Sequence, residues 1–294
     1  MMSLLMTHVL CTYFDVDRDD KDSDGNHYAC SGDNSNYIDM DGSSQSCESD
    51  DVLSSAQKTY LKEIVEDEAA TFFEEALFVD PVDDSLVLKE GWPEDGFSCS
   101  PMPFVCCEPL LPDEHTTVGV QDTDFLVYVT RRPTGGTIRA WAMICQSDQE
   151  GRPVAMQLNV DPSRIDPDGG DRNENILTAK HEITHGLGFT ADKFRELNII
   201  DEFDINGKKV DRIVSENVAD TAESFYDCPD WGVAAGGEIE DGGGDGTAGS
   251  HWEKRVLADV SRRASLKPPV EMNVDCLDNA GVYDRKIGAV HQSQ

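Results

Sequence analysis

The first patterned stretch of the chain runs from residue 54 to residue 79, where apolar side chains recur at helical spacing. Ser54 and Gln57 stand three residues apart at its start, as in a capping box that satisfies the first backbone N–H groups of a helix. The apolar positions that carry the spacing are Leu61, Ile64, Val65, Phe72 and Leu77. The pattern predicts an amphipathic helix that packs against a sheet.

Three short β-prone runs follow, at residues 125–129, 138–145 and 154–160. Glycine- and proline-containing turns separate them. A second helix is predicted over residues 176–185, ended by Gly186 and Gly188. Helix, strands and helix in this order predict a mixed α/β domain of the α+β class, with the second helix behind the sheet.

The pattern beyond Gly188 is looser. A helical stretch is predicted over residues 218–226, ended by Pro229. The glycine-rich loop GGEIEDGGGDGTAGS then leads to His251, and no regular pattern follows Ser261. We assign no secondary structure to that tail.

An acidic segment of low complexity occupies residues 1–53, where disorder or an irregular loop is the default expectation. The alternate acids Asp20, Asp22 and Asp24 before Gly25 match the start of a calcium-binding loop, and residues 39–42 repeat part of it. The twelfth loop position is a serine rather than the usual bidentate glutamate. An acidic calcium-binding interaction module is therefore one hypothesis for this segment.

The formal net charge is -34, from 58 acidic and 24 basic residues in a chain of 294. This charge argues against nucleic acid and anionic membranes as partners, because both would be repelled. Its ordinary explanation is solubility, and its functional one is attraction of cations or basic substrates.

Nine cysteines are spread along the chain without a CxxC pair, so disulfides in an oxidising compartment fit better than a cysteine zinc site. The odd number leaves at least one thiol outside intrachain pairs. The sequence contains no apolar stretch long enough to span a membrane and no convincing signal peptide.

The sequence HEITH lies inside the predicted second helix. Residues four apart share one helix face, so His181 and His185 can offer imidazole nitrogens to one zinc ion. Glu182 can reach a water bound to that zinc and take its proton as the water attacks a peptide carbonyl. The ordinary alternative is two surface histidines on an amphipathic helix.

A catalytic zinc site needs a third protein ligand. In thermolysin-like enzymes it is a glutamate further along the chain, and in metzincins the pattern continues as HExxHxxGxxH. Gly188 occupies the glycine position, but Ala191 stands where the third histidine is expected. The compact metzincin pattern therefore fails at that position.

HEITHGLGF, with a third histidine far downstream, resembles the leishmanolysin family of metzincin metallopeptidases. The stretch CPDWGVAAGGEIEDGGGDGTAGSHWEKR is similar to the family's segment around its third ligand, and VGVQDTDFLVYVT followed by AWAMICQ is similar to its strands. The resemblance covers roughly residues 54–257. It implies that His251 is the third zinc ligand, displaced by 251 − 191 = 60 residues from the compact position.

The resemblance further implies a zinc endopeptidase with one zinc per chain, protein or peptide substrates, stabilising disulfides and a secreted or cell-surface location. Some members of the family contribute to cell adhesion through cell-surface or matrix proteins. We expect an extended substrate to lie antiparallel to an edge strand from residues 138–145.

Three parts follow from this comparison: an acidic extension over residues 1–53, a metzincin-like catalytic domain over 54–257, and a divergent or truncated tail over 258–294. Within the catalytic domain, the upper part reaches about residue 188 and a long insertion occupies residues 191–250.

Three features depart from the family pattern. VLADVSRRASL stands where the family's Met turn is expected and has no methionine, and the next one is Met272. The cysteine-rich C-terminal region and the inhibitory cysteine motif of the pro-segment are not recognisable. A chain truncated or misjoined after about Leu257 would explain the first two. These departures keep open a catalytically weakened relative that acts in adhesion or partner binding.

Overall fold

The computed structural model describes residues 10–14, 27–32, 35–39, 42–82, 84–90, 111–135, 138–205, 208–226, 237–242 and 248–252. The chain divides into two units, residues 1–188 and residues 189–294, and each is described by itself. Among the described residues, no helix has the length and apolar character needed to cross a membrane.

A four-stranded sheet forms the centre of the first unit, in the order β1 (Leu10–Phe14), β6 (Phe125–Thr130), β8 (Pro153–Val160) and β7 (Ala140–Ser147). Strands β1, β6 and β8 run parallel to one another, and β7 runs antiparallel to β8 at an edge of the described sheet. The three predicted strand runs are confirmed as β6, β7 and β8. The predicted edge position of residues 138–145 is confirmed as well.

The predicted helix from residue 54 is one continuous helical run, made of α1 (Ser55–Lys62), a π-helical stretch (Glu63–Ala70) and α2 (Thr71–Ala76). The Ser54 side chain accepts a hydrogen bond from the backbone of Gln57, and the Gln57 side chain accepts one from the backbone of Ser54. The predicted capping box is therefore confirmed.

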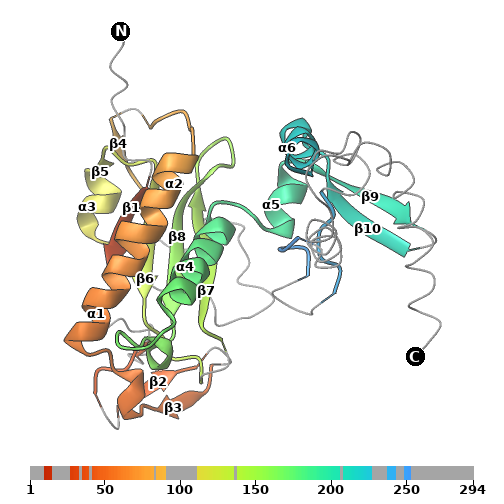
Figure 1. The fold of residues 1–294 in the computed structure, drawn as a ribbon. Coiled ribbons are helices and arrows are strands. Elements are labelled where there is room, and N and C mark those ends of the chain that lie inside the picture. Colours follow the sequence, from red (N-terminus) through yellow and green to blue (C-terminus); the bar gives the residue numbers. More distant parts are fainter. Residues whose placement is uncertain are drawn as a thin grey trace, which may run out of the picture. The chain divides into compact units, whose positions relative to one another are not determined.

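This helical run and α4 (Arg172–Gly186) cover the same face of the sheet (Figure 1). Alternate residues of β6 point into the core between the helices and the sheet, as the period of a strand requires. The fully buried members of this core include Val65, Val127, Val129, Met156, Leu158 and Ile183. The second predicted helix is confirmed in α4, which begins four residues earlier than expected.

The opposite face of the sheet carries β4 (Ser85–Leu86), α3 (Asp113–Thr117) and β5 (Val120–Gln121). Leu86 and Leu88 pack here against Leu126 and Tyr128, the β6 residues that point away from the helices. The sheet is therefore apolar on both faces, which explains why β6 is buried along its whole length.

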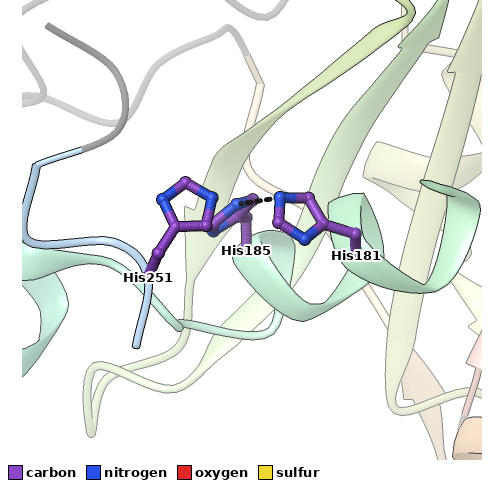
Figure 2. Close-up of side chains that lie close together, drawn as sticks. All are labelled: His181, His185 and His251. Carbon is purple, nitrogen blue, oxygen red and sulfur yellow. Dashed lines mark hydrogen bonds between the residues drawn. The ribbon is translucent and has the colours of Figure 1, made fainter. Parts of the chain in front are cut away.

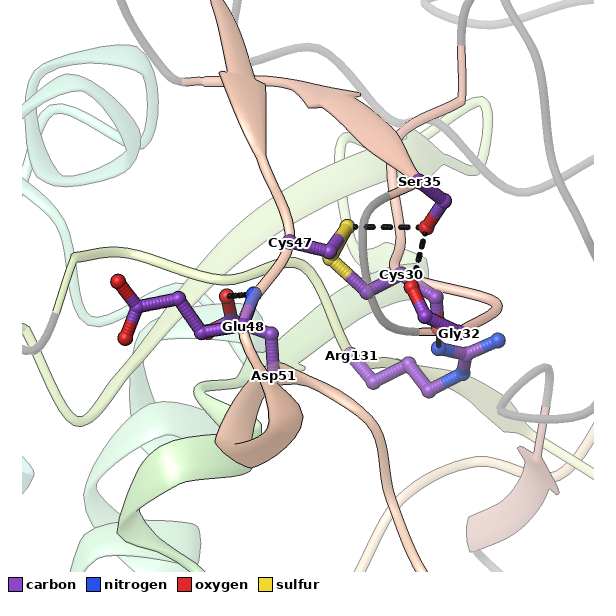
Figure 3. The surroundings of a disulfide bond; sticks show 7 residues. All are labelled: Cys30, Gly32, Ser35, Cys47, Glu48, Asp51 and Arg131. Carbon is purple, nitrogen blue, oxygen red and sulfur yellow. Dashed lines mark hydrogen bonds between the residues drawn. A yellow bond between two sulfur atoms is a disulfide. The ribbon is translucent and has the colours of Figure 1, made fainter.

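The expectation of disorder or an irregular loop before residue 54 was wrong for the described part of that segment. Leu10–Phe14 is the edge strand β1, because its apolar and aromatic side chains add to both faces of the sheet. A hairpin of β2 (Asn36–Ile38) and β3 (Ser44–Ser46) is closed by the Cys30–Cys47 disulfide (Figure 3). The proposed calcium-loop residues 20–25 lie outside the described residues.

Two buried arginines connect this N-terminal hairpin to the loop after β6. The Arg131 guanidinium donates to the carbonyl of Cys30. That of Arg132 donates to the carbonyls of Ile38 and Asp39, at 2.8 and 2.7 Å. Side chains from β6 and β8 complete the polar contacts, including Asn159, which accepts from the backbone N–H of Arg132. Short 3-10 turns, Ser49–Asp51 and Pro162–Arg164, lie nearby in the chain.

The second unit contains α5 (Ala191–Glu196), the hairpin of β9 (Ile200–Ile205) and β10 (Lys208–Ile213), and α6 (Glu216–Tyr226). The helix predicted at residues 218–226 is confirmed as α6, whereas α5 and the hairpin were not predicted. Two bridges extend the hairpin, because Arg212 pairs with Glu238 and Ile239 pairs with Trp252. A small apolar core contains Phe194, Ile213 and Ile239.

Candidate metal and catalytic site

Helix α4 presents two histidine rings one turn apart. The Nε2 atoms of His181 and His185 lie 3.0 Å from each other, and the two rings stand nearly perpendicular with centroids 4.6 Å apart (Figure 2). His181 is exposed and His185 is half-buried. The contact between the two nitrogens is a hydrogen bond, marked by the dashed line in Figure 2, and it leaves both rings close enough to reach one cation.

The spacing fits a zinc ion. Two ligands at about 2.0–2.1 Å from zinc with tetrahedral angles stand about 3.3 Å from each other, close to the distance observed here. Neutral imidazole is a common zinc donor, whereas calcium and magnesium require oxygen ligands. The donor set of α4 therefore suits zinc.

The opposite face of α4 holds the helix in place. Ala179 and Ile183 are buried in the core and lie four residues apart, so the histidines are turned outward. Gly186, directly after His185, lies against Met156: a Cβ atom there would be 2.1 Å from the Met156 sulfur. Close packing of the helix end against β8 thus fixes the position of the second histidine.

Glu182 lies between the two histidines in sequence and is buried, with 8% of its surface exposed. Burial raises the pKa of its carboxyl group to about 7, because the charged form loses hydration. A carboxylate with this pKa can both accept and return a proton near neutral pH.

His251 belongs to the second unit and is labelled with the α4 pair in Figure 2. Its carbonyl accepts a hydrogen bond of 2.8 Å from the backbone N–H of Glu240. The next residue, Trp252, stacks edge-on against Phe189 with ring centroids 5.0 Å apart. Phe189 is the fourth residue after His185, so the chain near His251 is held against the residues that follow α4.

Gly249 lies directly against Ala191, since a Cβ atom on Gly249 would stand 2.8 Å from the Ala191 Cβ. Ala191 is the position where the compact metzincin pattern places its third histidine. The loop that carries His251 is therefore packed at the position that the compact pattern assigns to a ligand.

The structure thus places His181, Glu182 and His185 together on α4. The membership of His251 in the same site stays a prediction from sequence, supported by the packing of its own loop. The expected position of the Met turn, residues 256–266, lies outside the described residues. Glu240, whose carboxylate lies 3.8 Å from the His251 ring, was not singled out by sequence reasoning.

A helix with two histidines one turn apart and a buried glutamate beside the first, packed on a mixed sheet, is the arrangement typical of metallopeptidase domains with the HExxH motif. Comparison with known families gives a more specific assignment: the model of the family described as leishmanolysin matches residues 12–268. The chain belongs to the leishmanolysin peptidase family. The match begins well before residue 54 and ends beyond residue 257, so it is wider than the range expected from the motifs.

Individual relatives agree with this assignment. The chain is 30% identical over 224 residues to leishmanolysin of Leishmania donovani, which covers 74% of this chain and 35% of that protein. It is 29% identical over 218 residues to a leishmanolysin homolog of Crithidia fasciculata, covering 72% of this chain and 31% of the homolog. A leishmanolysin-like peptidase of Drosophila pseudoobscura pseudoobscura is 31% identical over 184 residues, 47% of this chain and 26% of that peptidase. The chain spans about a third of the length of the curated relatives that it matches.

Proposed function

We propose that this protein is a zinc-dependent endopeptidase that binds one zinc ion through His181, His185 and His251 and uses Glu182 as the general base. The observation that carries the proposal is the geometry of α4. Its two imidazole nitrogens lie at a spacing suited to one zinc ion, and a buried carboxylate follows the first of them. Membership in a peptidase family supports the same activity.

Three observations support His251 as the third ligand. It follows a glycine-rich loop whose sequence resembles the family's segment around that ligand. Its loop packs on Ala191 through Gly249. Its neighbour Trp252 packs on Phe189, a short distance along the chain from His185. All three favour His251 as the third ligand.

When bound, zinc would acidify a water molecule and polarise the substrate carbonyl. The Glu182 carboxylate accepts the proton of the attacking water and delivers it to the leaving amide nitrogen. Burial raises the pKa of this carboxyl group, which makes the carboxylate a stronger base for the first transfer.

The substrates we propose are proteins or peptides in extended conformation. Strand β7 lies at the edge of the described sheet, and an antiparallel segment can add to it through main-chain hydrogen bonds. We also propose a secreted or cell-surface location, supported by the Cys30–Cys47 disulfide and by Cys145, which is disulfide-bonded as well. The catalytic domain, expected over residues 54–257, is proposed to include strand β1 as well, because β1 belongs to the same sheet.

Metal content and cleavage of denatured casein test the proposal. Wild type should contain one zinc ion per chain and release peptides, and phenanthroline should stop the release. His251→Ala should lose or weaken the zinc. Glu182→Ala should keep the zinc and lose about 10²–10⁴-fold in rate, the usual contribution of a general base. Wild-type protein without zinc would overturn the proposal.

A second candidate function is adhesion or partner binding by a catalytically weakened relative. It is favoured by one feature of the sequence, the missing methionine in residues 256–266. Zinc bound at full stoichiometry without any casein cleavage would support this second function over the first.

A further inference from the structure

A short extended segment in the second unit, residues 237–240, is paired on both of its edges. On one side Ile213 donates to the carbonyl of Gly237 and Ile239 donates to that of Asp211, at 2.8 and 3.0 Å. On the other side, Gly249 donates to the carbonyl of Glu240 at 2.7 Å. The segment therefore anchors the loop of His251 to β10.

The register of this pairing sets Glu240 opposite His251. Ile239 pairs antiparallel with Trp252, so the next position inward brings residue 240 across from residue 251 on the same face. The side chain of Ile239 points the other way, into the apolar core of the unit. Because successive side chains of this segment point to opposite faces, Glu240 lies on the face of His251 and Ile239 does not.

The two side chains are in contact at ion-pair distance, with 3.8 Å between the His251 Nδ1 and Glu240 Oε2 atoms. The Glu240 side chain is 9% exposed and the His251 side chain 22% exposed. This distance is longer than a direct hydrogen bond, and the two side chains form an ion pair only when the imidazole is protonated. Low exposure strengthens such a contact, because little water screens it.

Another acid nearby has a different neighbour. Glu238 pairs with the guanidinium of Arg212 at 3.9 Å, and Arg212 also lies over the ring of Phe203. The two glutamates are two residues apart and share a face, yet one faces an arginine and the other faces the imidazole. Glu238 is therefore part of the scaffold, and Glu240 is the carboxylate that faces His251.

Histidines that bind a metal through one ring nitrogen almost always donate the other N–H to a carboxylate, carbonyl or water. We propose that Glu240 is a positioning residue for the metal site: its carboxylate holds the Nδ1–H side of His251, so that Nε2 is directed to the metal. The inference rests on the proposed function, because it assumes that His251 is a ligand. Glu240 itself touches neither substrate nor metal in this scheme.

The test measures zinc affinity rather than activity. Competition with a chromophoric chelator at pH 7 should show zinc bound about 10–100-fold more weakly by Glu240→Ala than by wild type. Glu240→Gln should fall between them, because its amide oxygen still accepts a hydrogen bond but carries no charge. Asp241→Asn is the matched control: it removes the same charge from the next, exposed residue and should stay within about twofold of wild type.

A second readout separates positioning from loss of structure. The visible absorption bands of the cobalt-substituted protein should change in Glu240→Ala and not in Asp241→Asn, because they depend on the geometry of the ligands. The thermal midpoint of metal-free Glu240→Gln should stay at or above that of wild type, since an ion is removed from a poorly hydrated place.

Two results overturn the inference in distinguishable ways. Wild type that binds one zinc, with Glu240→Ala and Glu240→Gln binding it as tightly, overturns the role of Glu240 and leaves the proposed function standing. Wild type that binds no zinc overturns both. If Glu240→Ala does not fold, the isosteric Glu240→Gln decides.

Discussion

At the scale of single residues, Gly186 determines how closely α4, the helix of the candidate metal site, approaches the sheet. A Cβ atom at this position would lie 2.1 Å from the Met156 sulfur and 2.6 Å from its terminal methyl carbon, and Met156 is fully buried. Gly186→Ala should therefore lower the free energy of unfolding by about 1–3 kcal/mol, the usual cost of overpacking a core. Chemical denaturation measures this change.

Gly170→Ala is the control for that substitution, because nothing lies within 4 Å of a Cβ atom placed there. This control should be neutral or slightly stabilising, since alanine restricts the unfolded chain. Equal stability of Gly186→Ala and wild type would show that the core beneath α4 yields to an added methyl group.

His115 gives the fold a dependence on pH that is separate from the metal site. Its ring is buried, its Nδ1 atom lies 2.6 Å from the Tyr128 hydroxyl oxygen, and burial lowers its pKa below the ordinary 6.5. Below about pH 6.5 the unfolded chain takes up a proton that the folded chain resists. Stability should therefore fall with decreasing pH by up to about 1.4 kcal/mol per pH unit from this group.

Urea denaturation of wild type and His115→Gln at pH 7.5 and pH 5.5 tests the sign. Wild type loses the stability that depends on neutral His115 between pH 7.5 and pH 5.5, whereas the variant has no such group to titrate. The difference in unfolding free energy between the two proteins should therefore be smaller at pH 5.5. Thr116→Ala, one residue along α3, should follow the wild-type pH dependence. A substitution cost that is the same at both pH values would contradict the prediction.

At the scale of elements, the loop that carries His251 depends on Gly249. Its φ angle is +78°, where an L side chain is strained, and a Cβ atom would stand 2.8 Å from the Ala191 Cβ. Gly249→Ala should cost about 1–2 kcal/mol from the backbone alone and displace the loop. We expect weaker zinc binding in chelator competition, and Gly242→Ala, in open space, should leave the affinity unchanged.

The pair Ala191→Gly with Gly249→Ala sharpens this test. It removes the clash but not the backbone strain, so it should recover part of the lost affinity. No recovery would mean that the backbone conformation alone explains the loss. Unchanged affinity in Gly249→Ala itself would argue against a ligand role for this loop.

Elements with a strong period were predictable from the sequence, and elements without one were not. The helix after Ser54 and strands β6, β7 and β8 have apolar spacing that propensity and packing both favour. Strands β9 and β10 have few apolar residues and pair mainly through their backbones. Their one clear signal in the sequence is Asn206-Gly207 between the two runs, a dipeptide typical of hairpin turns.

At the scale of the whole molecule, the candidate site was predictable where its residues are close in sequence. His181, Glu182 and His185 follow from the helical period alone. His251 required resemblance to a family, because no rule of local structure connects residues so far apart. The prediction for the N-terminal segment failed for a different reason. Its acidic composition indicates disorder, but a disulfide and two buried arginines stabilise a segment that has few apolar residues.

That explanation predicts that the first unit depends on the Cys30–Cys47 bond. The two cysteines are separated by 17 residues, and closing such a loop in the unfolded chain is worth about 3 kcal/mol. The double variant Cys30→Ala with Cys47→Ala should unfold roughly 6–12 °C below wild type in a calorimetric scan. Cys11→Ser, which alters a free thiol, should lose much less.

The carbonyl of Cys30 accepts from Arg131, so release of the disulfide also loosens a buried arginine contact. The loss should therefore reach or exceed the value for loop closure alone, because a buried guanidinium that loses a hydrogen bond is destabilised. Removal of Arg131 in the double variant should then cost less than its removal from wild type. If removal of Arg131 costs the same with and without the disulfide, the hairpin and the loop after β6 are energetically independent. The disulfide and the arginine contact would then not explain the order of the N-terminal segment.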